Sequence, residues 1–158
     1  MTPKEFFDTH DLGDIDSDDN QWADMETFWM RGRPDSVALV ATVPGVLNDC
    51  ELRKFSVFSV RLIQHKITGP RISENLDAAW AFAEGRLHPE RFEIARDSAR
   101  SWARCAPHSE KYPAWFYAMV FERSALDAAK ETMWVATSRT MRAMQVQWLR
   151  ENTKPNFQ

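Results

Sequence analysis

Several features of membrane, secreted and redox proteins are missing from this sequence. No apolar run approaches the roughly 20 residues that a membrane-spanning helix needs, and the mean hydropathy is -0.50. The N-terminus lacks the basic region and apolar stretch of a secretory signal. The two cysteines, Cys50 and Cys105, lie far apart and form no CxxC, so we expect reduced thiols. These absences predict a cytoplasmic protein without membrane contact.

Glycine is also scarce, with five residues in 158. Strand-rich proteins with many tight turns usually use more. Trp and Phe are plentiful instead, at seven and ten residues, and each can bury a large apolar area. A chain of this length can build one sizeable core but is short for two ordinary domains.

Alanine recurs at three- and four-residue steps in the second half of the chain. The pattern covers residues 93–106 and 124–152 and is interrupted by Trp102, Trp134 and Trp148. Such spacing places the small residues on one helix face. We expect Ala and Trp to form the inward faces, with Trp filling the gaps where helices diverge.

Capping residues and chain breakers divide the sequence into helices. Thr2, Pro3 and Glu5 fit a capping box with Pro at the first helical position. The apolar run 37–43 could be a helix or a strand, and we favour a helix because no partner strand is visible elsewhere. Helices are expected at about residues 3–10, 20–31, 36–43, 50–65, 73–84, 88–105, 113–121 and 124–152, with a break or kink near residues 122–123 between the last two.

These segments predict an all-α fold, a single-domain bundle of six or seven helices over residues 1–158. Short connections favour antiparallel helical hairpins, and the C-terminal helix should be the longest. The chain then comprises an acidic helical region (1–47), an Ala/Trp-rich core (48–152) and a polar tail (153–158).

Charge is distributed unevenly along the chain. Residues 1–50 carry three basic and eleven acidic side chains, a net charge of -8, whereas residues 51–158 carry 17 basic and 12 acidic ones, a net charge of +5. This asymmetry allows two faces with different electrostatic partners. Alternatively, the acidic segment folds onto the basic one and partly neutralises it, and we favour this simpler interpretation.

Four carboxylates in the N-terminal loop are candidate partner-binding residues: Asp14, Asp16, Asp18 and Asp19. The loop resembles the start of a calcium loop, but its sixth position is Asp19 rather than Gly and its twelfth is Met25 rather than Glu. We therefore predict no metal and no cofactor. The carboxylates could stabilise the N-terminus of the following helix, or imitate nucleic-acid phosphates for a basic partner.

A row of arginines forms the second candidate surface. Arg96, Arg100 and Arg104 follow one another at i, i+4 spacing, so they could contact a carboxylate-rich partner or phosphate. The alternative is a solvated helix face neutralised by Glu93 and Asp97. Because the net charge is -3 and no basic cluster stands out, nucleic-acid binding is not expected.

No catalytic motif is present. The chain has no GxSxG, no HExxH and no Gly-rich phosphate loop, and its four histidines are not paired with the cysteines. We therefore predict a non-enzymatic protein. An unrecognised enzyme is an alternative if His88 or His108 meets carboxylates in a pocket. The densest aromatic stretch, residues 112–117, suits core packing at a helix start and could instead be a contact surface.

Two sequence blocks carry a resemblance to a known group. Leu52–Arg61 begins Leu-Arg-Lys-Phe, and Arg71–Gly85 ends in Ala-Glu-Gly; a final Gln145 precedes Leu149 and Arg150. The pattern resembles a group of uncharacterised Ala/Arg/Trp-rich helical proteins of bacteriophages, actinobacteria and planctomycetes, although this chain has fewer consecutive alanines. The resemblance covers about residues 48–151. It implies an all-helical fold and a phage origin, and it carries no catalytic residues.

Together, the absent chemistry, the split charge and the resemblance predict a non-enzymatic inhibitor. It would occlude a basic surface of a protein partner, for instance as a phage-encoded, anti-CRISPR-like inhibitor of a bacterial defence system in the host cytoplasm. Because some related Ala-rich helical families resemble toxin-immunity proteins, an immunity protein that neutralises a toxin is the first alternative. An unrecognised enzyme is the second.

Overall fold

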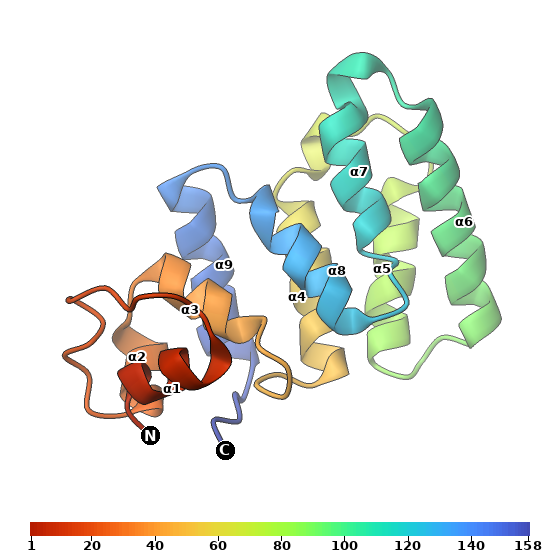
Figure 1. Ribbon diagram of the computed structural model, residues 1–158. Coiled ribbons are helices and arrows are strands. Elements are labelled where there is room, and N and C mark those ends of the chain that lie inside the picture. The colour runs from red at the N-terminus through yellow and green to blue at the C-terminus, as the bar shows by residue number, and fades with distance from the viewer. The chain divides into compact units, whose positions relative to one another are not determined.

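The computed structural model describes residues 1–158, and every regular element in it is helical (Figure 1). The predicted all-α class is confirmed, but the chain forms nine α-helices rather than six or seven. They belong to two compact units: residues 1–47 with 138–158 (unit 1), and residues 48–137 (unit 2). No helix has both the length and the apolar character that a bilayer crossing requires.

Unit 2 contains five α-helices and three short 3-10 helices. Figure 1 shows the chain reversing direction between successive helices from α4 to α8, and each of these helices packs against the next in sequence. Their bounds are α4 (Asp49–Arg61), η1 (Gln64–Lys66), α5 (Ile72–Ala83), α6 (Pro89–Cys105), η2 (His108–Glu110), α7 (Lys111–Met119), α8 (Ala125–Thr132) and η3 (Met133–Val135).

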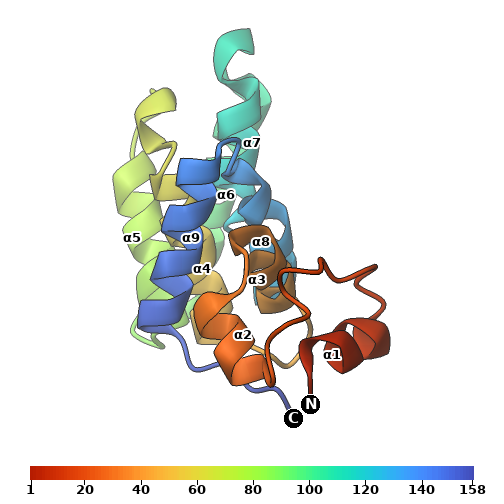
Figure 2. The same ribbon diagram turned by 90° about the vertical axis from the view of Figure 1, so that its left-hand side faces the viewer.

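Unit 1 joins the two ends of the chain. Its helices are α1 (Pro3–His10), α2 (Met25–Arg31), α3 (Pro34–Ala41) and α9 (Arg139–Asn152). The predicted capping box of Thr2 and Glu5 is present at α1, and the ambiguous run 37–43 lies mainly in α3. Helices α3 and α9 lie side by side (Figure 2).

The C-terminal tail is packed rather than merely polar. The amide of Asn156 donates a hydrogen bond to the Val46 carbonyl at 2.8 Å. The ring centroid of Phe157 lies 6.0 Å from that of Phe6 and 5.9 Å from that of Trp29. Residues 153–158 therefore help to close the core of unit 1.

The predicted helix over residues 124–152 is wrong as a single element. It divides into α8, η3 and α9, and the longest helix is α6, with 17 residues. Ala136 is extended, and the Ser138 side chain accepts a hydrogen bond from the Met141 amide at 3.1 Å. Ser138 therefore begins a new helix as an N-cap, because its hydroxyl satisfies an otherwise free N–H. Likewise, α2 begins at Met25 rather than at residue 20, because Asp24 caps it.

Alanines lie on the inward helix faces as predicted, but the three tryptophans expected there do not fill the core. Ala99, Ala128 and Ala129 are fully buried. By contrast, Trp134 is 58% exposed, and Trp102 and Trp148 are half-buried. The large side chains that fill the cores are Phe28, Phe55, Phe116, Phe121 and Tyr117. Phenylalanine fills four of these five sites without a polar atom that must find a partner.

Arg53 holds the end of α7 in unit 2. Its side chain extends from α4, is 3% exposed, and donates hydrogen bonds to the carbonyls of Val120 at 2.7 Å, Arg123 at 3.0 Å and Glu122. Its guanidinium carbon lies 5.0 Å from the centre of the Phe92 ring. Burial lowers the pKa of Arg53 to about 10. These carbonyls lie in the turn that follows α7, and the buried guanidinium supplies their hydrogen-bond donors.

Unit 1 uses the same arrangement at the end of α2. Arg150 of α9 donates from Nε to the Trp29 carbonyl at 2.7 Å and from Nη2 to the Gly32 carbonyl at 2.8 Å. Burial lowers the pKa of Arg150. Many helices end instead with a left-handed glycine that satisfies these carbonyls. In a chain with so few glycines, arginines from neighbouring helices take over that role.

We predict that Arg53→Met destabilises the protein by about 3 kcal/mol, because the buried carbonyls after α7 lose their donors. The measurement is the free energy of unfolding in urea. The matched control is Arg86→Met, since Arg86 is exposed and pairs with Glu84 at the surface, where such pairs contribute less than about 1 kcal/mol. An equal loss in both variants would contradict this role of Arg53.

A buried polar contact links α5 to α7 in unit 2. The Asn75 side-chain amide donates to the Tyr117 hydroxyl at 2.7 Å and to Ser98 Oγ at 3.2 Å. Tyr117 is 1% exposed, and burial raises the pKa of its hydroxyl to about 12. Folding therefore favours the neutral phenol over the phenolate.

This raised pKa predicts a loss of stability in alkali. The stabilising effect is complete below the unfolded-state pKa of about 10 and is lost as the pH rises through about 12. Between about pH 8 and pH 11, the wild type should lose about 1 kcal/mol more unfolding free energy than Tyr117→Phe. Urea unfolding at both pH values measures this difference. Identical pH profiles for the two proteins would rule out the effect.

Candidate functional site

Two carboxylates of the acidic N-terminal loop of unit 1 bind other parts of that unit's backbone and side chains. Asp16 accepts a hydrogen bond from the Asp18 amide at 3.0 Å and forms an ion pair with Arg33. The hydrogen bond from the Asp18 amide, together with the Arg33 charge, holds the pKa of Asp16 below its usual value. The Asp16 carboxylate therefore stabilises the loop, and its charge is partly neutralised by Arg33.

Asp19 does not belong to the exposed acidic surface. It is 1% exposed, and its Oδ1 accepts a hydrogen bond from the Arg33 amide at 2.7 Å. Its Oδ2 is buried without a hydrogen-bond partner. The structure thus places the predicted partner-binding residue Asp19 inside unit 1, where its carboxylate ties the loop to the start of α3. Sequence pattern alone could not separate Asp19 from its exposed neighbour Asp18.

Asp14 and Asp18 are the predicted carboxylates that remain available. Both are exposed, and neither lies within ion-pair distance of a basic side chain. Asp14 also lines a hollow of about 240 Å³. The residues that surround this hollow are Phe7, Leu12, Asp14, Asp16, Arg33, Asp35, Ser36 and Leu39. Its apolar and acidic groups together suit a long basic side chain, which has an apolar stem and a charged end.

The C-terminal segment reduces the acidity of unit 1 without abolishing it. Unit 1 carries seven basic and eleven acidic residues, a net charge of -4. One direct contact between the two segments is the ion pair of Arg142 with Asp35, at 3.0 Å. The expected partial neutralisation therefore occurs here, and the loop carboxylates Asp14 and Asp18 lie outside that ion pair.

The predicted arginine row is used largely inside unit 2. Arg96 is 8% exposed and donates to the Phe121 carbonyl at 3.1 Å, so it is not part of a docking surface. Arg100 forms an ion pair with Glu122 at 2.9 Å. Arg104, by contrast, is exposed. The first two therefore bind the same turn between α7 and α8 that Arg53 binds, and only Arg104 remains free for an outside contact.

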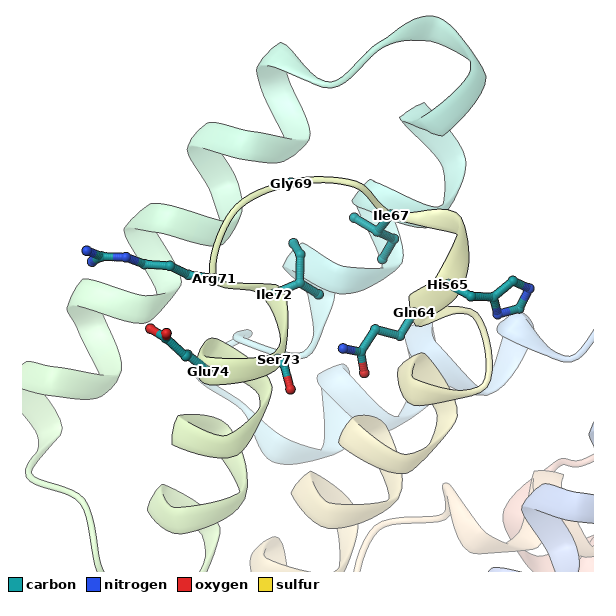
Figure 3. A pocket seen from close by; sticks show the side chains of 8 residues that line it. All are labelled: Gln64, His65, Ile67, Gly69, Arg71, Ile72, Ser73 and Glu74. Carbon is teal, nitrogen blue, oxygen red and sulfur yellow. The ribbon is translucent and has the colours of Figure 1, made fainter.

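A second hollow, of about 620 Å³, lies where η1 leads into α5 (Figure 3). In Figure 3, Ile67 and Ile72 approach each other across the loop, whereas His65 and Arg71 point away in opposite directions. His65 does not face Ser73, so the two do not form a pair of base and nucleophile. The lining residues are Gln64, His65, Ile67, Gly69, Arg71, Ile72, Ser73 and Glu74.

The loop that borders this hollow is held from two sides. Glu110 of η2 accepts hydrogen bonds from the Thr68 amide at 3.2 Å and the Thr68 hydroxyl at 2.8 Å. Gly69 lies against the indole of Trp102, where an added Cβ would come within 2.5 Å of the ring. Glycine is required here because of this close approach.

His88 and His108, the histidines of the enzymatic alternative, both stand at the start of a helix. His88 caps α6 by accepting a hydrogen bond from the Glu90 amide at 3.3 Å, and His108 begins η2. Neither lines the hollow before α5. No group of three or more His, Cys, Asp or Glu side chains is arranged to hold a metal ion.

Comparison with protein-family models, curated proteins and solved structures gave no match to this chain.

The contact between Gly69 and Trp102 gives a prediction for the loop. Gly69→Ala should destabilise the protein by about 2 kcal/mol, because the new methyl group overlaps the indole. The same substitution in a Trp102→Ala background should cost less than about 0.5 kcal/mol, because the overlap is gone. A double-mutant cycle of unfolding free energies measures the difference. Equal costs in the two backgrounds would show that the indole does not limit this position.

Proposed function

We propose that this chain is a non-enzymatic binding protein that occludes a basic surface of a protein partner with its acidic loop. The observation that carries the proposal is the pair of exposed carboxylates, Asp14 and Asp18, on a loop that Asp16 and Asp19 hold in place. A loop fixed before binding loses less conformational entropy when it meets its partner.

A basic surface is the partner chemistry that this loop fits best. Unit 1 has a net charge of -4, so it repels nucleic acid and attracts basic proteins at long range. The hollow beside Asp14 combines apolar walls of Phe7 and Leu12 with carboxylates. A lysine or arginine side chain of the partner can pack its apolar stem against Phe7 and Leu12 and place its charge beside the carboxylates.

The specific form that we propose is a phage-encoded inhibitor of a bacterial defence system, anti-CRISPR-like in action, in the host cytoplasm. Nuclease effectors of such systems carry basic channels for nucleic acid, and an acidic loop can compete for such a channel. The phage origin rests on the resemblance of residues 48–151. An immunity protein that neutralises a basic toxin uses the same chemistry, and the identity of the captured partner distinguishes the two.

The test is affinity capture from a bacterial lysate with quantitative identification of the bound proteins. Asp14→Asn/Asp18→Asn should reduce capture of the specific partner about tenfold, because two charges at the contact are lost. Binding of the wild type should also weaken as salt is raised, since exposed charges are screened.

The matched control is Asp97→Asn/Asp127→Asn, which removes the same charge from exposed positions of unit 2. Its capture should equal that of the wild type. Full capture by the loop variant, or an equal loss in the control, would contradict a role for the loop.

A further inference from the structure

The outer face of α7 carries two aromatic side chains that unit 2 leaves largely exposed. Tyr112 is 61% exposed and Trp115 is 42% exposed. Because η2 leads directly into α7, helical spacing places His108, Lys111, Tyr112 and Trp115 on one face. We call these four residues the α7 stripe. Exposed Trp and Tyr side chains are among the strongest contributors to protein interfaces.

The exposed rings of Tyr112 and Trp115 both pack against the buried ring of Phe116. The Phe116 side chain is 2% exposed. Its ring centroid lies 4.7 Å from that of Tyr112 and 5.2 Å from that of Trp115, and both pairs are T-shaped. Rings that are already held in position lose little entropy on binding. The stripe is therefore a preformed contact surface.

The charge beside the rings is positive. The Lys111 ammonium is held at the end of α6, where it donates to the Arg104 carbonyl at 2.7 Å, and both residues are exposed. The adjacent carboxylate of Glu110 is engaged by Thr68. An occupant of this face consequently meets the exposed Lys111 on the same helix face as two aromatic rings.

From this juxtaposition we infer that the α7 stripe docks an acidic protein segment with apolar anchor residues. The anchors pack on Tyr112 and Trp115, and the carboxylates face Lys111. A nucleic acid would need a broad basic footprint, whereas unit 2 as a whole carries 13 basic and 12 acidic residues. This site is separate from the acidic loop, so it stands whether or not the loop binds a partner.

The test uses the full chain and a synthetic helical peptide of about 16 residues, with Leu at every third or fourth position and Glu elsewhere. The readout is the indole N–H resonance of Trp115 in a 15N NMR spectrum, assigned by its loss in Trp115→Phe. The peptide should shift this resonance. Trp115→Ala and Lys111→Glu should each weaken binding about tenfold. Because Trp115→Ala lacks the indole, its binding is measured from the shifts of the Lys111 and Phe116 backbone amides.

Ile94→Ala is the matched control, because Ile94 is another exposed apolar residue of unit 2, on α6, and its loss should leave the affinity unchanged. Circular dichroism checks that each variant keeps its helices. A peptide with Lys in place of Glu should bind about tenfold more weakly. The inference is overturned if the Lys peptide, a thymidine oligonucleotide or anionic phospholipid vesicles bind as well as the Glu peptide. It is also overturned if Trp115→Ala binds the Glu peptide like the wild type.

Discussion

A guanidinium that reaches across to the end of a neighbouring helix is the interaction on which both units depend. Arg53 binds the carbonyls after α7, and Arg150 binds those at the end of α2. Short helices leave a large fraction of their carbonyls unpaired, and this chain has few glycines to close them. Each arginine both completes the hydrogen bonding and fixes the position of one helix against another, because its planar fork binds several carbonyls at once.

This use of arginine decides which charges remain for recognition. Arg53, Arg96 and Arg100 all bind the turn between α7 and α8. The surface of unit 2 therefore offers fewer cations than its sequence suggests. In unit 1, Asp19 is likewise used to hold the loop, which leaves Asp14 and Asp18 exposed. The side chains proposed to bind partners are therefore few and exposed, and residues close to them in sequence stabilise the structure that carries them.

Local signals predicted the starts of helices well where a cap or breaker is decisive, as for the helices expected from about residues 3, 88 and 124. They failed where a single capping residue interrupts a continuous helical pattern. Ser138 is such a residue, and the sequence predicted one helix where the structure has two. The arginine row failed for a different reason. Spacing of i, i+4 shows that residues share a face, but whether that face meets solvent or another turn of the chain depends on tertiary packing. The same limit applies to Asp19, and to the aromatic run 112–117, in which Tyr112 and Trp115 are exposed but Phe116 and Tyr117 are buried.

The most direct test of this arrangement is NMR detection of scalar couplings across the hydrogen bonds of a 15N,13C-labelled sample. We expect couplings from the Arg53 guanidinium nitrogens to the Val120 carbonyl carbon, and from Arg150 Nε to the Trp29 carbonyl carbon. The corresponding N–H protons should exchange slowly with water. Guanidinium protons that exchange at the rate of free arginine, without such couplings, would contradict this arrangement.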